Sequence, residues 1–187
     1  MRAIIFGATM NLTARSPIST PISCLFTASF VACCFAGPAL GSEKIAVFEF
    51  ELQQGATVPG VPSKKEAEDK RRKMVTERLR DYLSKAGFTV IDTSPLDPKV
   101  SAANLQACGE CAADFARELG ADYAFTGFVY KVSELVLSMS VRVHEAATSK
   151  PVTSATVDMR GNTDESWRHG IDYLYQNVLT PRLERLH

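Results

Sequence analysis

Few of the residues that build metal and cofactor sites occur in this sequence. Its histidines are His144, His169 and His187, and no two of them stand at the spacing of metal ligands. Beyond residue 41 the only cysteines are Cys108 and Cys111, which leaves a zinc site two ligands short. Ala112 follows the second cysteine, where a c-type haem site requires histidine. We therefore expect neither a metal nor a cofactor.

Charge is balanced rather than concentrated. The 21 bases equal the 21 acids, and acids interrupt the one basic run at residues 64–73, as on the solvated face of a helix. Nucleic-acid binding is driven by clustered positive charge, so we expect no nucleic-acid partner. Residues 55–60 have no Lys-Ser/Thr pair for a P-loop. Ser133 has no histidine and acid placed by the sequence to activate it, so no catalytic residue is predicted.

Acidic residues are absent from the first 41 positions. Arg2 and Arg15 precede or flank an apolar run from Pro17 to Phe35, and small residues lead from there to Gly41. A positive end, an apolar middle and a small-residue exit are the three parts of a secretory signal. We predict a signal segment at residues 1–41, cleaved near Gly41, and one periplasmic or secreted domain at residues 42–187.

Alternatives remain for this amino-terminal segment. Pro21 and the polar residues of the apolar run make it a poor permanent span, and no span is expected once the signal is removed. The residues Phe30-Val-Ala-Cys33 resemble a lipobox with Phe in place of the usual Leu. A lipoprotein anchored at Cys33 is therefore an alternative, and Met1 and Met10 are both candidate starts of translation.

Hydrophobic periodicity predicts five strands and three helices after residue 43. The strands are expected at Lys44–Phe50, Phe88–Asp92, Tyr123–Lys131, Leu135–His144 and Val152–Arg160, and the helices at 64–86, at 101–119 with a break near Gly109, and from 162 to Pro181. A loop is expected after Phe50. The order β-α-β-α-β-β-β-α predicts an α/β fold, a single two-layer sandwich with a mixed five-stranded sheet.

Local residue choices sharpen these boundaries. Ser63 and Glu66 have the form of a capping box, and Gly87 and Gly120 stand where left-handed helix C-caps are expected. Pro181 is expected to end the last helix. The alternating residues Leu135, Leu137, Met139, Val141 and Val143 are expected on one buried face of their strand.

Several of these segments resemble segments of known protein families. The runs Ile45-Ala-Val-Phe-Glu-Phe50 and Gly87-Phe-Thr-Val-Ile-Asp92, with Leu119-Gly-Ala-Asp-Tyr123 before Thr126-Gly127, resemble the amino-terminal domain of the Tol-Pal protein TolB and the core of the curli secretion protein CsgG. The motifs Lys131-Val-Ser133 and Arg160-Gly-Asn-Thr-Asp-Glu-Ser-Trp167 are similar to a family of uncharacterised exported proteins of rhizobia and methylotrophs. The resemblance implies an envelope domain that binds other proteins or assembles. Counterparts of the membrane-crossing hairpins of CsgG are missing, so a pore is not implied.

Cys108-Gly-Glu-Cys111 is the sharpest local motif. Two thiols separated by two residues can close a disulfide, bind metal or exchange electrons. A thioredoxin-like site expects the pair directly after a strand, whereas residues 104–107 are predicted as helix or turn. An oxidising compartment favours a structural disulfide, and a redox-active or ligand-binding pair is the alternative.

A second group of candidates surrounds the start of the last helix. This group is a candidate partner or ligand site. Its members are Arg160, Asn162, Asp164 and Trp167, together with Lys131 and Ser133 from the turn between two strands. A structural interpretation competes with this one. Asn162 or Thr163 would cap the helix, Asp164 would favour its positive end, and Trp167 would anchor it on the core.

The sequence therefore predicts a non-enzymatic exported protein that binds or helps assemble another envelope protein. A thiol–disulfide or small-ligand-binding protein that uses Cys108 and Cys111 is the first alternative. A lipid-anchored outer-membrane accessory, which depends on Cys33, is the second.

Overall fold

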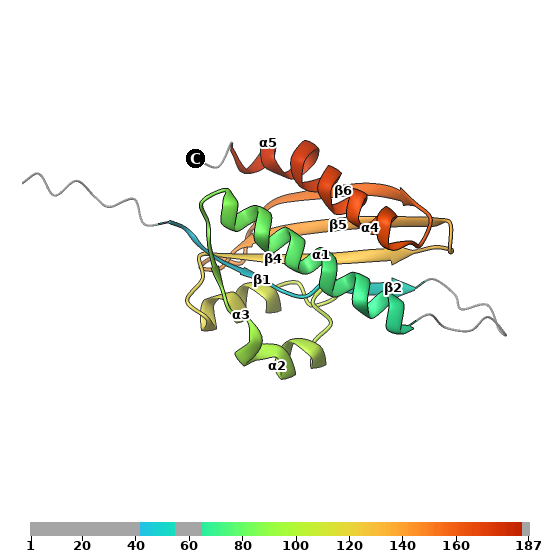
Figure 1. Ribbon diagram of the computed structural model, residues 1–187. Helices are drawn as coiled ribbons and strands as arrows, with labels where there is room; N and C mark the ends of the chain where they lie inside the picture. The colour runs from blue at the N-terminus through green and yellow to red at the C-terminus, as the bar shows by residue number, and fades with distance from the viewer. Residues whose placement is uncertain (1–41, 55–64, 185–187) are drawn as a thin grey trace, which may run out of the picture. The chain divides into compact units, whose positions relative to one another are not determined.

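The computed structural model describes residues 42–54 and 65–184. In chain order the elements are β1 (Lys44–Val47), β2 (Glu51–Gln54), α1 (Lys65–Lys85), β3 (Thr89–Ile91), a 3-10 turn (Ser94–Leu96), α2 (Asp97–Ala102), α3 (Cys111–Glu118), β4 (Tyr123–Lys131), β5 (Val136–Glu145), β6 (Pro151–Arg160), α4 (Asp164–Tyr173), a π-helical segment (Leu174–Leu179) and α5 (Thr180–Leu183) (Figure 1). The predicted signal segment, Cys33 and the capping residue Ser63 lie outside the described residues. Within the described ranges, none of the helices combines the length and apolarity that a membrane crossing requires.

The strands form one mixed sheet in the order β3-β1-β4-β5-β6. β1 is parallel to β3 and β4, whereas β4, β5 and β6 form an antiparallel meander. This arrangement confirms the α/β fold with a mixed sheet and its predicted strands. β2 is an additional strand, parallel to β4, in a stretch that was predicted to be a loop.

A one-residue irregularity separates β1 from β2. Ile45 lies opposite Tyr123 and Glu51 lies opposite Phe128, so the β1–β2 side has one residue more than β4 over the same stretch. Such an insertion bends a strand and shifts which side chains face each side of the sheet. The predicted strand 44–50 is therefore split, and its last part becomes the irregular junction between β1 and β2.

The main core lies between the sheet and the helices α1 and α4 with their π-helical extension. Its buried side chains include Ile45, Val47, Val75, Leu79, Leu83, Phe125, Leu137, Met139, Val141, Val143, Trp167, Ile171 and Leu174. The alternation predicted for β5 is confirmed except at Leu135, which is 73% exposed. Leu135 lies in the turn before β5, whose first residue is Val136, and so it falls outside the sheet's pleat.

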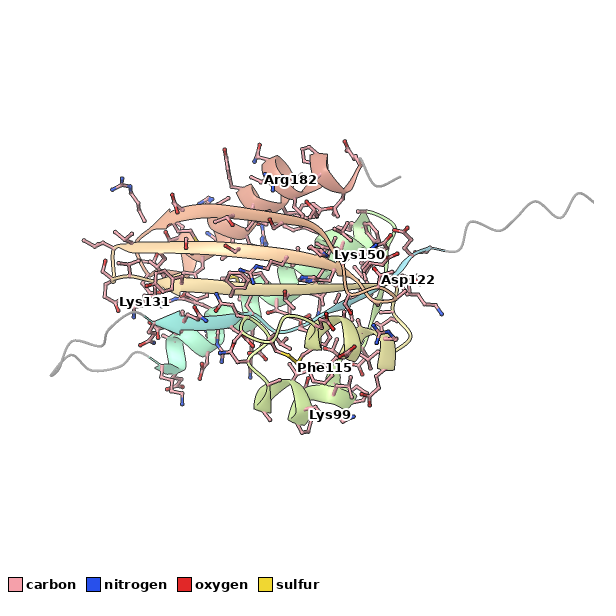
Figure 2. The ribbon with its side chains drawn as sticks, turned by 180° about the vertical axis from the view of Figure 1, so that it is seen from behind. Lys99, Phe115, Asp122, Lys131, Lys150 and Arg182 are labelled. Atoms are coloured by element: carbon pink, nitrogen blue, oxygen red, sulfur yellow. A yellow bond between two sulfur atoms is a disulfide. The ribbon has the colours of Figure 1, made fainter. Side chains whose placement is uncertain are left out.

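A smaller cluster lies on the other face of β1 and β4. Ala46 and Ala124 meet Ala112 and Ala116 of α3 there, and these small side chains let the helix lie close to the strands. Figures 1 and 2, drawn from opposite sides, show α1 and α3 on opposite faces of the sheet. β1 and β4 are therefore buried on both faces, unlike β6 at the edge.

Helix boundaries follow the predicted glycines but depart from two other predictions. Gly87 and Gly120, with φ of 99° and 72°, occupy the left-handed positions expected after α1 and α3. The predicted helix 101–119 is confirmed over α3 and in its break near Gly109, but its first part is wrong, because α2 begins at Asp97 and residues 103–110 separate it from α3. The carboxylate of Glu51 accepts hydrogen bonds from the backbone N–H groups of Leu105 (2.9 Å) and Gln106 (3.3 Å), which holds this linker out of helical conformation.

The last helix does not end at Pro181. It continues to Leu183 because Pro181 lies in the first turn of α5, where a missing backbone N–H is tolerated. A π-helical segment precedes Pro181. At its end the backbone N–H of Thr180 bonds to the carbonyl of Tyr175, five residues back in the chain.

Polar side chains tie α1 to α4 at the surface of the main core. The guanidinium of Arg78 binds both carboxylate oxygens of Asp172, and the hydroxyl of Tyr82 donates to the same carboxylate at 2.8 Å. The ring of Tyr82 stacks on that of Tyr175, with centroids 4.6 Å apart. Burial alone would raise the pKa of Asp172, but the hydrogen bonds from Arg78 and Tyr82 outweigh it and place the pKa below its usual value.

Gly127 on β4 is a position where the core has no room for a side chain. A Cβ atom added there would overlap the ring of Phe50. We expect Gly127→Ala to destabilise the domain by about 1–3 kcal/mol, measured by urea unfolding, because overpacking forces neighbours off their preferred positions. Gly109→Ala is the matched control, since a Cβ there would meet no atom within 4 Å. Equal stability of the two variants would contradict this account.

Candidate functional site

One buried carboxylate joins segments that are distant in the sequence. Glu68 of α1 is 1% exposed. Its Oε1 accepts hydrogen bonds from Nζ of Lys131 at the end of β4 and from Nδ2 of Asn162, the latter at 2.8 Å. Its Oε2 accepts from Nε2 of Gln54 on β2 at 2.9 Å. We call these four residues, with Glu134, Arg71 and Trp167, the Glu68 cluster.

Asn162 is the second centre of this cluster. Its Oδ1 accepts from the indole N–H of Trp167 (2.9 Å) and from Nη1 of Arg71 (3.2 Å). Its Nδ2 also donates to Glu134 at 3.1 Å, so both ends of this buried side chain have partners. Arg71 in turn binds Asp164 through Nε at 2.7 Å. The cluster therefore links α1 to the junction between β6 and α4.

The Glu68 cluster lies directly beneath the turn between β4 and β5. Lys131 forms ion pairs with both Glu68 and Glu134, and its side chain is 13% exposed. The backbone carbonyl of Glu134 accepts from the N–H of Asn162 (2.9 Å), and that of Leu135 accepts from Gly161 (3.0 Å). Figure 2 shows Lys131 at one end of the sheet, with Asp122 and Lys150 at the other. The turn is thus fastened to the β6–α4 junction at that end.

The electrostatics of Lys131 suit a structural role. Burial lowers the pKa of this ammonium, but the hydrogen bonds and charges of Glu134 and Glu68 outweigh burial and raise the pKa above its ordinary value. An ammonium held charged in this way has no lone pair to offer, so Lys131 does not act as a general base or a nucleophile at neutral pH.

The structure brings most of the sequence-predicted candidates together. Lys131, Asn162, Trp167 and, through Arg71, Asp164 belong to one network, whereas Arg160 contributes only its backbone carbonyl to Ser166 and its side chain is exposed. Ser133 lies within the turn, and its Oγ accepts from the N–H groups of Leu135 (3.2 Å) and Val136 (3.1 Å).

Thr163 caps α4, accepting from the N–H of Ser166 at 3.2 Å, which settles the helix cap in favour of Thr163 over Asn162. Asn162 is thereby free to serve the Glu68 cluster instead.

Sequence reasoning missed Glu68, which it placed on a solvated helix face. A usable pattern was present, since Glu68 lies seven residues before Val75, followed by Leu79 and Leu83, on the buried stripe of α1. An acid on an apolar stripe requires a partner from elsewhere in the fold. That partner, Lys131, is 63 residues away in the chain.

Cys108 and Cys111 lie where the α2–α3 linker meets α3. The structure places a disulfide between them, with Cα atoms 5.6 Å apart. Cys111 is the first residue of α3, so the bond fastens the linker to the helix that covers β1 and β4. No group of three or more histidine, cysteine or acidic side chains suited to a metal ion occurs in residues 42–54 and 65–184.

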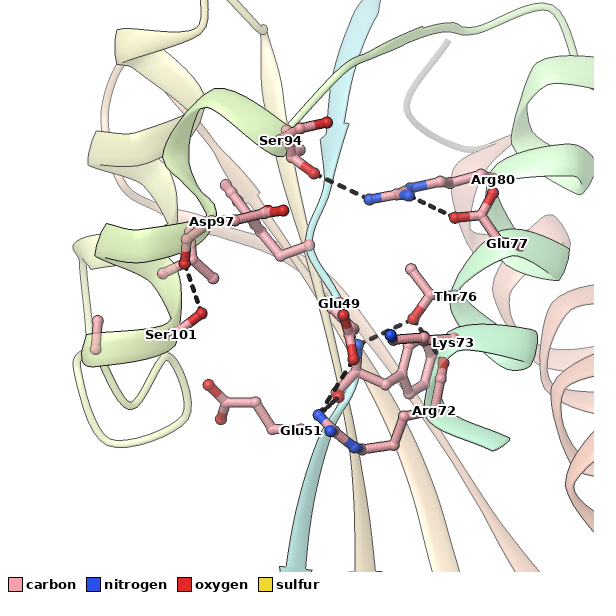
Figure 3. A pocket seen from close by; sticks show the side chains of 15 residues that line it. Glu49, Glu51, Arg72, Lys73, Thr76, Glu77, Arg80, Ser94, Asp97 and Ser101 are labelled. Carbon is pink, nitrogen blue, oxygen red and sulfur yellow. Dashed lines mark hydrogen bonds and ion pairs between the residues drawn. The ribbon is translucent and has the colours of Figure 1, made fainter. Parts of the chain in front are cut away.

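A cleft of about 460 Å³ lies between α1 and α2 over the β1–β2 junction (Figure 3). Side chains of α1 bind the backbone of this junction: Arg80 donates to the carbonyl of Val47 (2.7 Å), Arg72 donates to that of Phe50 (3.1 Å), and Thr76 Oγ1 accepts from the Phe50 N–H (3.0 Å). Away from the cleft, on the β6 edge of the sheet, Arg182 donates to the carbonyl of Ser154. Two of the three basic side chains that line the cleft, Arg72 and Arg80, are therefore engaged by the protein's own backbone, and Lys73 is the third.

The fold and the cluster define an α/β domain whose polar residues form structural links rather than an assembled catalytic group in the described part of the chain. Residues 43–179 match the DUF3280 family, described as "Protein of unknown function (DUF2380)", and the chain belongs to this family. A search of curated proteins found no match.

Several solved structures are similar to this chain. The LpoB C-terminal domain from Salmonella enterica is 18% identical over 63% of this chain and 82% of its own, with a TM-score of 0.42. Lipoprotein GNA1162 from Neisseria meningitidis is 15% identical over 77% and 99%, with a TM-score of 0.48. The PelC dodecamer from Paraburkholderia phytofirmans is 21% identical over 78% and 91%, with a TM-score of 0.41. In each case the identity is below 25% and the TM-score is below 0.5.

The Lys131–Glu68 pair should matter far more to stability than a surface pair. We expect Lys131→Met to destabilise the domain by about 3–5 kcal/mol in urea unfolding, because it leaves a buried carboxylate without its counter-charge. Lys85→Met, which breaks the exposed Lys85–Asp81 pair, is the control and should cost no more than about 0.5 kcal/mol. The double variant Glu68→Gln, Lys131→Met should recover part of the loss. Similar effects of the two lysine substitutions would refute a structural role for the cluster.

Proposed function

We propose that this chain is an exported, non-enzymatic domain that binds another protein of the bacterial envelope. One observation carries the proposal: Lys131 and Glu68, the charged pair at the centre of the candidate site, are almost completely buried, and further side chains hydrogen-bond to Glu68 beneath the β4–β5 turn. Such an arrangement holds a surface segment in place. It does not hold a substrate.

Catalysis would need a different arrangement of the same groups. A general base must carry a free lone pair within reach of a substrate proton, at a pKa near the working pH. Lys131 is held charged by two carboxylates, and both oxygens of Glu68 accept hydrogen bonds from the protein itself. This network stabilises the shape of the turn, and a binding surface requires such a preorganised shape.

Export is supported by residues 1–41, with their positive end, apolar middle and small-residue exit. The Cys108–Cys111 disulfide suits the oxidising compartment to which such a signal leads. A lipid anchor at Cys33 would place the same domain at a membrane surface without changing its binding role.

The test uses the tagged full-length chain in its own host. Crosslinking of the envelope, purification and mass spectrometry should yield one stoichiometric envelope protein, and the mature amino terminus should begin just after Gly41. A partner-free monomer, or turnover of a substrate by the purified domain alone, would overturn the proposal. A mature terminus at a lipidated Cys33 would keep the binding role and replace the free periplasmic location with an anchored one.

The disulfide is proposed to be structural. We expect the double variant Cys108→Ser, Cys111→Ser to unfold roughly 2 kcal/mol more easily, as the chain-entropy relation gives for so short a loop, and to retain its partner. Treatment of the wild type with a reductant should reproduce that loss and leave the double variant unchanged. Loss of partner capture at unchanged stability would instead favour the thiol–disulfide alternative.

A further inference from the structure

We propose that the β4–β5 turn is the partner-binding surface, and that it enters an apolar groove on the partner that carries a carboxylate at its rim. The proposal rests on the protein-binding function above and names the surface and the chemistry of its partner. It is carried by an exposed apolar patch, by the buried support beneath that patch, and by an exposed cation beside it.

Exposed large apolar side chains gather at this turn. The turn patch consists of Tyr130 (43% exposed), Val132 (59%), Leu135 (73%) and Val136 (51%), and in the described residues one further large apolar side chain, Tyr173, is comparably exposed. Together the four present an area on the order of 400 Å², which is the size of patch that is often functional on a monomer. The concentration at one turn is therefore unlike the scattered apolar residues of an ordinary surface.

The strand register places two of these side chains on the open face of the sheet. Lys131 lies opposite Leu137, and both side chains face α1, where Lys131 meets Glu68 and Leu137 enters the main core. Tyr130 and Val136 are their neighbours in the two strands, so they point to the other face. The patch thus continues from the turn onto the sheet surface that α1 does not cover.

The patch is held rigidly from below. The N–H of Val132 bonds to the carbonyl of Val136 at 3.0 Å, and the carbonyls of Glu134 and Leu135 bond to the β6–α4 junction. Lys131 anchors the same turn to the buried Glu68. A short turn between two strands needs no buried ion pair merely to reverse the chain. Its effect is to order the patch before binding, which reduces the entropy lost when a partner binds.

Arg160 gives the patch a charge that the partner can match. It lies opposite Val136 in the β5–β6 register. Within residues 42–54 and 65–184 its guanidinium makes no hydrogen bond or ion pair, and the nearest acid on its strand, Asp158, lies opposite Ser138. Tyrosine and arginine, with tryptophan, are enriched at the energetically important positions of protein interfaces. A carboxylate at the rim of the partner's groove would pair with Arg160 while the groove floor buries Val132 and Leu135.

The dimensions and charges of the patch argue against two other occupants. Two copies of the patch face to face would bury on the order of 800 Å², less than the roughly 1,200 Å² at which stable interfaces begin, whereas a groove would also cover the flanks of the turn, so a second copy of this chain is not favoured. An anionic lipid surface attracts clustered bases. Here Lys131 is paired with Glu68 and Glu134, which leaves Arg160 as a single exposed base at the turn and no cluster of bases.

The experiment places a photo-crosslinking benzoylphenylalanine at position 135 of the full-length chain in its own host, with the same probe at position 173 as the matched control. Position 135 should capture one different protein and position 173 should not. The crosslinked peptide of that protein, mapped by mass spectrometry, should be apolar and adjacent to an Asp or Glu. Val132→Asp should lower the yield at least tenfold and Arg160→Glu severalfold, whereas Tyr173→Asp should leave it unchanged.

Several outcomes would overturn the proposal. These are equal capture at positions 135 and 173, capture of a second copy of this chain or of lipid at position 135, and a yield that Val132→Asp and Arg160→Glu leave undiminished. Thermal unfolding of each variant checks that it folds, and the mapped crosslink still decides if Val132→Asp does not fold. Capture at another exposed position but not at 135 would refute the turn and leave the binding function standing. Absence of capture at every position would refute both.

Discussion

The burial of the Glu68 carboxylate is the constraint on which this end of the molecule depends. A charge removed from water must be paired and fully hydrogen-bonded, or the fold loses several kcal/mol. Glu68 meets that requirement with donors from β2, β4 and the β6–α4 junction, three segments that lie together at this end of the sheet. Helix α1 is therefore fixed in rotation and in position along the sheet by one side chain, in addition to its apolar stripe.

Helix α1 also contacts the sheet through a second set of side chains. Its apolar stripe of Val75, Leu79 and Leu83 packs in the main core. Arg72, Thr76 and Arg80, on the adjoining stripe, bind the backbone of the irregular β1–β2 junction, where the N–H of Phe48 also bonds to the carbonyl of Phe125 on β4 (3.0 Å). The inserted residue that splits the predicted first strand is tolerated because these side chains replace the missing ladder bonds.

Local pattern predicted the fold well and the site only in part. The meander followed from alternation, and Gly87 and Gly120 marked helix ends because left-handed backbone favours glycine. The errors depend on distant contacts. The conformation of the α2–α3 linker depends on hydrogen bonds to Glu51, and the burial of Glu68 depends on its pairing with Lys131. Asn162 and Trp167 were recognised as candidates from their local motif, but their hydrogen bond to each other and the link to α1 depend on tertiary packing that the motif does not encode.

Arginine side chains on the strand edges have a consequence for the protein's behaviour at high concentration. An open strand edge is a template on which another chain can add, and it leads to aggregation in crowded compartments. Arg72 and Arg80 occupy carbonyls at the β1–β2 junction, and Arg182 occupies that of Ser154 on the outermost strand. With guanidinium groups already bonded at these positions, a neighbouring molecule finds no uninterrupted row of acceptors there. At these positions the strand edges are therefore less open to pairing with a neighbouring chain.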